Sequence, residues 1–143
     1  MSRLMGIDYG FKNIGIAMSD LTQTVASPFS VIENLSFREN ALRILEIVDK
    51  NDVSLIVLGL PINMNGSFGE MTKTVYKFIN VIKSFRDVRV ETIDERLTTT
   101  QVEKMLINEA DLSRRERKCV KDKVAAALIL QIYLDVHISG SRI

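Results

Sequence analysis

Apolar residues in the first part of the chain are spaced as in β-strands rather than helices. Residues 3–8 and 14–18 are short apolar runs separated by a turn, which is typical of a β-hairpin. Gly10 lies in that turn, where glycine is free to adopt a positive φ. Residues 24–32 predict a third strand, and Pro28 within it indicates an edge or a bulge because proline cannot donate to a sheet ladder. The chain is therefore expected to begin with three antiparallel strands.

The pattern changes near residue 40, where helical spacing begins to alternate with continuous apolar runs. Apolar positions three and four residues apart predict helices over residues 40–50, 70–85, 98–108 and 120–136. Residues 54–59 form an unbroken apolar run, typical of a strand buried on both faces, and residues 87–93 predict one more strand. This alternation indicates an α/β fold, a central mixed five-stranded sheet flanked by helices. No linker or repeat divides the sequence, so we expect a single domain over residues 1–143.

The composition limits the chemistry that the chain can perform. It contains one cysteine, Cys119, and one histidine, His137, which excludes an internal disulfide framework and a zinc cluster. Neither residue has the sequence neighbours of a nucleophile–base pair, and His137 is expected at the surface or at a helix end. Any metal ion must therefore be held by carboxylates. The single cysteine and the lack of a signal peptide or membrane span predict a cytoplasmic protein with no membrane partner.

The formal net charge of +1 argues against a strong overall attraction to polyanions. The charge is unevenly placed, however, because residues 113–123 form the densest basic stretch. Its cations before position 119 are Arg114, Arg115, Arg117 and Lys118. One interpretation is a grip on a phosphate backbone, and the other is a solvated helix start or loop.

Three carboxylates stand out because each adjoins an apolar segment. Asp8 ends an apolar run, where an ionised group is unfavourable unless it is paired or bound to metal. Glu95 follows a buried strand, and Asp122 precedes an Ala-rich apolar stretch. Each also has a structural explanation: Asp8 as a turn cap, Glu95 as the partner of a cation, and Asp122 as an acidic residue at a helix start.

Taken together, the three carboxylates favour a metal site. Strand ends and an adjoining helix can meet at one edge of an α/β sheet, and divalent cations relieve the repulsion among clustered carboxylates. Such ligands suit one or two Mg²⁺ or Mn²⁺ ions, which activate water for phosphodiester cleavage, with Asp8 as the bridging ligand. Adjacent residues of a strand point to opposite faces, so only one of Asp94 and Glu95 is expected to reach the site, and the pattern alone does not choose.

Four stretches of the sequence resemble the YqgF/RuvX family, in the family's order and over nearly the whole chain. They are GIDYGFKNIGIA (6–17), VLGLPINMNG (57–66), DERLTT (94–99) and DKVAAALILQIYL (122–134). Members of the family are described as Holliday junction resolvases and are implicated in pre-ribosomal RNA processing. The resemblance implies a ribonuclease H-like fold and a metal-dependent nuclease. It places the acidic site on Asp8, Glu95 and Asp122, and so selects Glu95 over Asp94.

Further residues are candidates for contacts with nucleic acid. Lys12 lies in the first matching stretch, but Asn13 stands where the family usually has a second basic residue. Arg96 has two interpretations, a phosphate contact and a partner that holds Glu95. Asn63 lies in the loop after the buried strand, where open α/β sheets place their sites, although the same loop is also the turn that such a unit needs.

Other functions and substrates stay open on the sequence. A similar hairpin opens the actin-like kinases, but this chain is too short for their two lobes. A non-catalytic nucleic-acid-binding module of the same fold is the other alternative. The substrate is either a ribosomal RNA precursor, at the 5′ end of the small-subunit RNA, or branched DNA. Junction resolution would call for a symmetric homodimer, because paired incisions need paired sites, whereas RNA processing would not.

Overall fold

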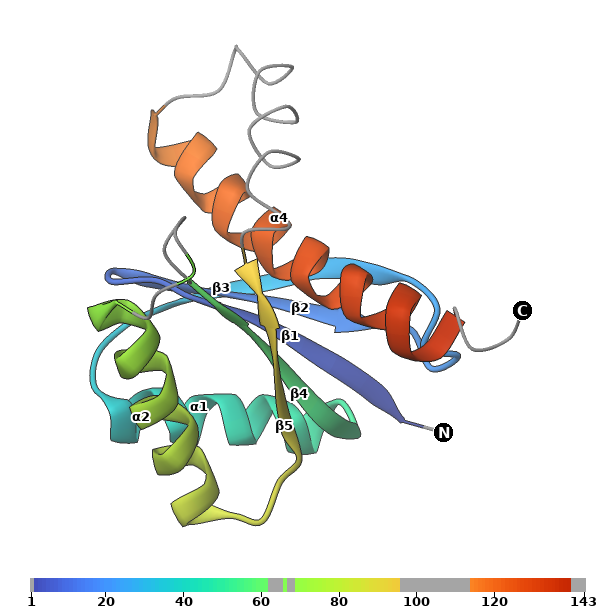
Figure 1. The fold of residues 1–143 in the computed structure, drawn as a ribbon, viewed down its shortest axis with the longest axis horizontal. Coiled ribbons are helices and arrows are strands. Elements are labelled where there is room, and N and C mark those ends of the chain that lie inside the picture. Colours follow the sequence, from blue (N-terminus) through green and yellow to red (C-terminus); the bar gives the residue numbers. More distant parts are fainter. Residues whose placement is uncertain (1, 62–65, 67–68, 96–113, 140–143) are drawn as a thin grey trace.

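A five-stranded mixed sheet forms the centre of the computed structural model, which describes residues 2–61, 66, 69–95 and 114–139 (for 114–123, 138 and 139, the backbone alone). The strands are β1 (Arg3–Tyr9), β2 (Asn13–Ser19), β3 (Ala26–Glu33), β4 (Val53–Leu60) and β5 (Val90–Asp94). Their order across the sheet is β3-β2-β1-β4-β5 (Figure 1). The first three strands pair antiparallel, whereas β4 pairs in parallel with both β1 and β5. The predicted α/β class and mixed sheet are confirmed.

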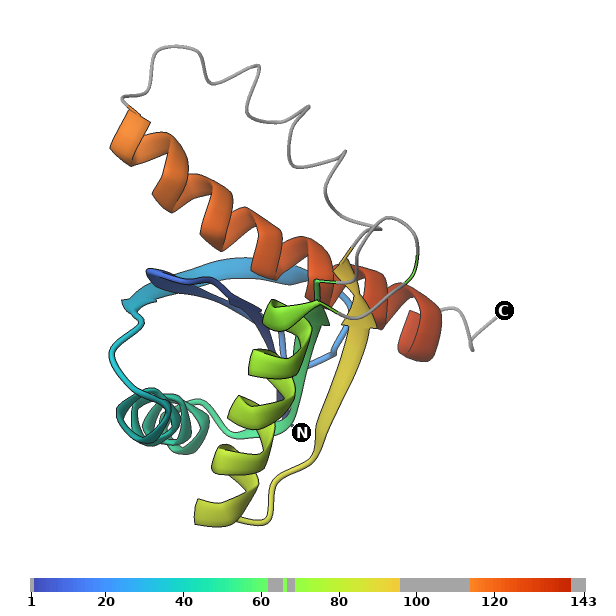
Figure 2. The same ribbon diagram turned by 60° about the vertical axis from the view of Figure 1, so that its left-hand side comes forward.

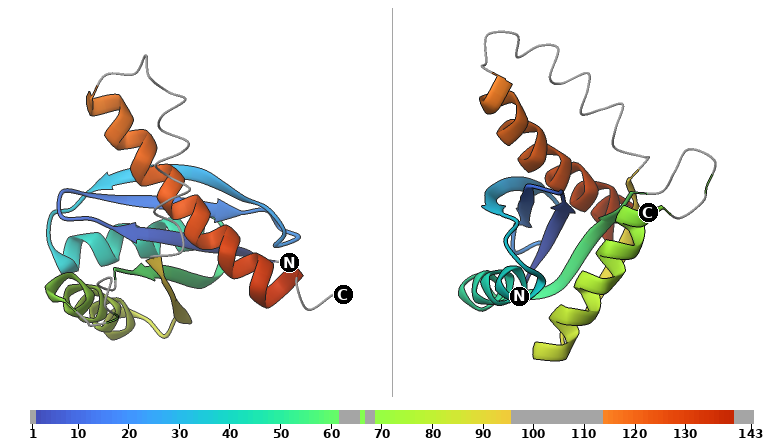
Figure 3. Two further views of the ribbon diagram at one scale, coloured as in Figure 1. Left: turned by 45° about the horizontal axis from the view of Figure 1, so that its top comes forward. Right: turned by 90° about the vertical axis from the view of Figure 1, so that its left-hand side faces the viewer.

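Helices cover both faces of this sheet, as Figures 2 and 3 show from further directions. α1 (Phe37–Lys50) and α2 (Glu70–Phe85) pack on one face, and α4 (Arg114–Leu134) crosses the other. A short π-helical turn, Asp135–Ser139, follows α4. Among the described residues, no helix is both long and apolar enough to span a membrane.

The two faces of the sheet contribute to two separate apolar clusters. Along β4, Ile56 and Leu58 belong to the cluster beneath α1 and α2, whereas Leu55 and Val57 belong to the cluster beneath α4. Because both faces of this strand are covered, its sequence is an unbroken apolar run rather than an alternation.

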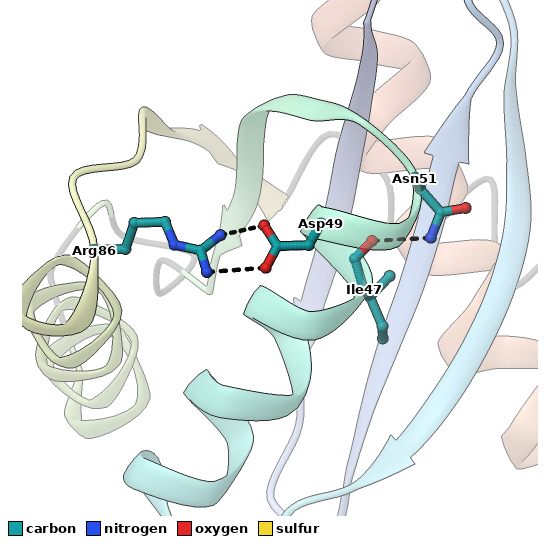
Figure 4. Close-up of polar contacts among 4 residues, drawn as sticks. All are labelled: Ile47, Asp49, Asn51 and Arg86. Carbon is teal, nitrogen blue, oxygen red and sulfur yellow. Dashed lines mark hydrogen bonds and ion pairs between the residues drawn. The ribbon is translucent and has the colours of Figure 1, made fainter.

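Polar contacts fix the ends of the helices on the first face. The Ser36 hydroxyl accepts a backbone N–H of the first turn of α1 at 3.1 Å, and the Asn51 side chain donates to the Ile47 carbonyl at 2.9 Å at the other end (Figure 4). Arg86, just beyond α2, pairs through both terminal nitrogens with both oxygens of Asp49, and this bond lowers the pKa of Asp49. Both side chains are largely exposed, so the ion pair positions the helix ends but contributes little stability.

Helix α4 lies directly on β1 because Gly6 has no side chain there. A Cβ on Gly6 would stand 2.7 Å from the carbonyl oxygen of Ala126 and 2.7 Å from the Cβ of Leu130. Near its C-terminal end, α4 is tied to β5 by a hydrogen bond from the Tyr133 hydroxyl to Glu91. Burial, together with this bond, raises the pKa of Tyr133 to about 12. The helix is therefore held both at the central strand and at one edge of the sheet.

A buried amide links α1 to the hairpin between β1 and β2. Asn40 is fully buried, accepts the Leu35 N–H at 3.0 Å and donates to the side chain of Asn34 at 2.7 Å. Asn34 in turn donates its side-chain amide to the Gly10 carbonyl and its backbone N–H to the Lys12 carbonyl, both at 2.8 Å. A chain of hydrogen bonds thus runs from the interior to the tip of the hairpin.

Most elements lie where the apolar spacing predicts them. α2 covers residues 70–85 as predicted. Pro28 lies on β3, which is an edge strand, and it pairs with Ala17 beside a register shift between Ile16 and Ala17. Both alternatives offered for this proline are therefore confirmed. His137 is exposed beyond the end of α4, as expected, and its ring stacks on Tyr133.

One local expectation is wrong, a conformation allowed at Gly10 is not used, and one expectation lies outside the described residues. Gly10 does not adopt a positive φ. Its requirement is steric instead, because a Cβ there would stand 2.6 Å from the carbonyl oxygen of Asn13, to which the Gly10 N–H donates at 3.0 Å. The last helix begins at Arg114 rather than at residue 120, because helical backbone extends into the charged stretch. The helix predicted over residues 98–108 lies outside the residues that the structure describes.

Replacing Gly6 by Ala is expected to lower the free energy of unfolding by about 1–3 kcal/mol. The atoms that the new methyl group would meet are a helix carbonyl and a Cβ, neither of which can rotate away. Urea unfolding followed by circular dichroism measures the change. Ser27→Ala, at an exposed position of β3, is the control and should change stability by less than about 0.5 kcal/mol. An unchanged midpoint for Gly6→Ala would show that α4 does not depend on this close approach.

Asn40→Ala is expected to lower the free energy of unfolding by about 2 kcal/mol, because it removes both the acceptor of the Leu35 N–H and the donor to Asn34. The same urea titration tests this expectation. Asn80→Ala, an exposed amide on α2, is the matched control. Equal stability of the two variants would contradict a structural role for the buried amide.

Candidate active site

Asp8 lies on the central strand and on the face that α4 covers. Side chains alternate along a strand, and Gly6, two residues earlier, faces α4, whereas Ile7 belongs to the core on the other face. Asp8 pairs with Gly15 of β2. The parallel register aligns Ile7 with Leu58, so the next residue of β4, Gly59, lies beside Asp8. This half-buried carboxylate therefore has a glycine as its neighbour on each side in the sheet.

Glu95 reaches the same face from the far side of β4. It follows β5, and its carboxyl carbon lies 3.4 Å from the position that a Cβ on Gly59 would take. The Cδ1 of Ile129, in α4, lies 2.6 Å from that position. The Glu95 carboxyl therefore lies over Gly59 and beneath α4. Asp94 pairs with Leu60 and follows Ile93, which packs against the cluster beneath α4, so strand alternation turns Asp94 to the other face.

Position 122 lies within α4, one helical turn before Ala126. The Ala126 carbonyl sits over Gly6, and α4 runs opposite in direction to β1 (Figure 1). Position 122 lies four residues before Ala126, a displacement of about 6 Å along the helix axis. Asp8 lies two residues after Gly6, a displacement of about 6.6 Å along the strand. From the contact between Gly6 and Ala126, the backbone at position 122 is therefore displaced in the same direction as Asp8. For Asp122 the structure describes the backbone but not the side chain.

The structure removes one structural explanation for Asp122. An acidic residue caps a helix or interacts with its dipole only within the first turn. α4 begins at Arg114, so Asp122 lies in its third turn. The expectation that this residue opens the helix was wrong, and a helix-start role does not account for an acidic residue there.

The other candidates are distributed around this face. Lys12 is exposed at the tip of the β1–β2 hairpin. The basic residues Arg114, Arg115, Arg117 and Lys118 belong to the first turns of α4, which project away from the sheet (Figures 1 and 3). Asn63 and Arg96 lie outside the described residues.

A carboxylate of β1 and one just past the end of β5 thus share one face of the sheet. Carboxylate oxygens are hard ligands of the kind that Mg²⁺ and Mn²⁺ prefer. Within the described part of the chain, no group of three or more His, Cys, Asp or Glu side chains is placed to hold a metal ion. Asp8 and Glu95 are two of the three predicted ligands.

Sequence reasoning missed the glycines that make room for these carboxylates. In the sequence, Gly59 ends an apolar run and indicates only the end of a strand and the start of a loop. A side chain there would meet both Ile129 and Glu95. Glycine inside a buried strand is a recognised signal of close approach by another group, and this signal could have located the site.

Comparisons with known proteins agree on one family. The family model described as "RuvX: Holliday junction resolvase" matches residues 2–136. A protein of Endomicrobium trichonymphae is 61% identical over 137 residues, covering 96% of this chain and 98% of its own length, and one of Thermoanaerobacter pseudethanolicus is 44% identical, covering 93% and 96%. Both are named as candidate pre-16S rRNA nucleases.

Solved structures show the same fold at low identity. RuvC of Thermus thermophilus, in complex with a Holliday junction substrate, superposes with a TM-score of 0.51 at 15% identity, covering 96% of this chain and 97% of that chain. The fowlpox virus resolvase, in complex with substrate Holliday junction DNA, gives 0.56 at 14% identity, covering 95% and 99%. The fold is thus ribonuclease H-like. With the match over residues 2–136, these findings show that the chain belongs to the RuvX family of Holliday junction resolvases and is a nuclease.

Proposed function

We propose that this nuclease cleaves phosphodiester bonds with one or two Mg²⁺ or Mn²⁺ ions held by Asp8, Glu95 and Asp122. The observation that carries the proposal is the position of the Glu95 carboxyl over Gly59, the residue that lies beside Asp8 in the sheet. Neighbouring strands lie about 4.8 Å apart, so carboxylates on β1 and over β4 are close enough to share a cation. Asp122 completes the set from α4, whose close contact with β1 brings position 122 toward Asp8.

Each carboxylate has a distinct task in this proposal. Asp8, on the rigid central strand, would be the ligand common to both ions if two are bound. Glu95 and Asp122 flank it from β5 and α4. Divalent ions held there would lower the pKa of a bound water molecule and offset charge on the leaving oxygen. No serine, cysteine or histidine nucleophile is needed, in keeping with a chain that has one cysteine and one histidine.

We propose the precursor of 16S ribosomal RNA as the substrate and the cytoplasm as the place of the reaction. The names of the relatives with 61% and 44% identity over almost their whole lengths support this choice. The family description and the structural neighbours keep junction DNA as the competing substrate, for which a homodimer would be required. The family match over 2–136 is consistent with one nuclease domain spanning the chain.

The substrate is tested by incubating the enzyme with labelled precursor RNA and labelled four-way junction DNA in parallel, with Mn²⁺. Cleavage near the 5′ end of the mature RNA, with the junction left intact, is the expected result. Paired cuts in the junction, together with dimer formation in analytical ultracentrifugation, would replace RNA by DNA as the substrate.

Asp8→Asn and Glu95→Gln are each expected to reduce cleavage by roughly 100-fold or more, because each removes a charged metal ligand worth several kcal/mol of transition-state stabilisation. The fold should be kept, and Asp8→Asn should leave stability equal or slightly higher because it relieves repulsion between carboxylates. Initial rates with Mn²⁺, together with urea unfolding, measure both effects.

Asp94→Asn is the matched control for Glu95→Gln, since it neutralises the adjacent carboxylate on the other face of β5. It should retain cleavage within about threefold, which is less than 1 kcal/mol of activation free energy. If Asp8→Asn cleaved at the wild-type rate, this result would contradict the proposed metal site. Binding of RNA by the wild type without cleavage under any divalent metal would instead support a non-catalytic module.

We further propose that phosphates are contacted by cations and amides around this face. The residues are Lys12, Asn63, Arg96, Arg114, Arg115, Arg117 and Lys118. Support comes from Lys12, which lies four residues from Asp8, and from the basic stretch that shares α4 with Asp122. Local cations allow a chain of net charge +1 to bind a polyanion.

Replacing Arg114, Arg115 and Arg117 together by Ala is expected to weaken binding uniformly across RNA sequences and to flatten its salt dependence. The slope of log K against log salt should fall by about 0.7 for each phosphate of a single strand that the variant no longer neutralises. Fluorescence anisotropy at several salt concentrations measures it. The control triple variant, Arg43, Lys50 and Lys83 to Ala, removes the same charge from the opposite face of the sheet. An equal change of slope in both variants would exclude a specific grip.

A further inference from the structure

An exposed aromatic ring lies at the tip of the hairpin that carries Asp8. Phe11 is 82% exposed, more than any other large apolar side chain in the described part of the chain. Leaving a phenyl ring in water forgoes about 1.5–3 kcal/mol of burial free energy. A ring that stays exposed on an ordered turn is available to a partner that covers it.

The turn beneath this ring is held in one conformation. The residues on either side of Phe11 each give their carbonyl to Asn34, which the buried Asn40 holds in turn. The Gly10 N–H also closes the turn by donating to the Asn13 carbonyl at 3.0 Å. Phe11 is thus presented on a preorganised support, and binding to it loses little backbone entropy.

The surface beside the ring is hollow and of mixed chemistry. A hollow of about 560 Å³ is lined by Phe11, Lys12, Asn13, Glu33 and Asn34. This volume is within the usual range of small-ligand sites, about 300–1,000 Å³. The ring offers a stacking surface and the amides offer hydrogen bonds, while the opposite charges of Lys12 and Glu33 leave the lining with no net charge. An uncharged planar group fits this lining better than an anion does.

The tip is also close to the proposed site of cleavage. Three peptide units separate Asp8 from Phe11, so their Cα atoms are at most about 11 Å apart. A nucleotide bound at the tip is thus a close neighbour of the bond beside Asp8.

We propose that Phe11 is a stacking platform for an unpaired nucleobase next to the scissile phosphate, so that the enzyme requires single-stranded nucleic acid at that position. The proposal rests on the nuclease function proposed above and adds the strandedness of its substrate. Base–aromatic stacking tolerates any base, because every base has a π-face, so the platform selects for lack of pairing rather than for sequence.

The test measures binding of a fluorescent single-stranded RNA of about 12 nucleotides, within the range of known single-strand site sizes. Anisotropy titrations are done in EDTA, so that no bond is cut. Phe11→Ala should weaken binding roughly 5- to 150-fold, the equivalent of about 1–3 kcal/mol per stacked base. Phe11→Tyr keeps a ring and should bind within about threefold of the wild type.

Two controls separate stacking from a general loss of apolar surface. Phe85→Ala removes a ring that is 43% exposed at the end of α2 and should leave RNA binding unchanged. A fully paired duplex of the same sequence should bind wild type and Phe11→Ala equally, because its bases cannot reach the ring.

A scan with one abasic nucleotide at each position of the RNA locates the stacked base. At one position, the abasic RNA should bind the wild type as weakly as intact RNA binds Phe11→Ala, with no further loss when the two changes are combined. Additive losses at every position, or equal loss on the duplex, would overturn the platform. Unchanged RNA binding by Phe11→Ala, with cleavage in Mn²⁺ intact, rejects the platform but keeps the nuclease. A wild type that neither binds nor cuts RNA rejects the platform together with the RNA substrate proposed above.

Discussion

The contact between α4 and the backbone of β1 is the constraint on which the rest of this structure depends. At Gly6 a helix carbonyl approaches the strand to a distance that a methyl group would prevent. Through this contact α4 covers the second face of the sheet and buries the apolar side chains that β1 and β4 present there. It also fixes the height of α4 above the sheet, and so the position of every turn of the helix relative to Asp8. A bulkier residue at position 6 would displace the helix and open the site together.

A second glycine serves the chemistry rather than the packing. Carboxylates beside an apolar core are unfavourable unless a cation or hydrogen bonds compensate for lost hydration. Gly59 leaves a volume between β1 and β5 that Glu95 enters from one side and Ile129 from above. In our proposal the cation compensates the carboxylates, and Ile129 limits the water that would otherwise weaken their hold on it. Apolar packing and ion binding are therefore parts of one arrangement around a residue with no side chain.

The sequence predicts those features that depend on apolar periodicity and fails where a single backbone approach decides. The unbroken apolar run of β4 and the apolar stripe of α2 can be recognised in the sequence because many residues of each element must be apolar. The start of α4 was missed because its charged first turns carry no apolar signal. At Gly10 the sequence allows a positive φ but does not reveal the close approach of the Asn13 carbonyl, which is the actual requirement. Apolar periodicity did not choose between Asp94 and Glu95; the family resemblance selected Glu95, and the position of its carboxyl near Gly59 agrees with that choice.

Our proposals place two kinds of attraction beside the acidic site, and the two should respond differently to salt. With a net charge of +1, the protein in our proposal attracts a polyanion by local cations, such as those at the start of α4, and that part of the affinity should fall as counterions compete. Stacking on Phe11 involves no counterion release and should persist in high salt. The hydrogen-bonded hairpin can thus hold a base in register while the charged helix governs encounter. The hairpin continues into β1, the strand that carries Asp8. A base held on the Phe11 ring would therefore fix which phosphodiester bond lies beside Asp8, because only a few residues of ordered backbone separate the two.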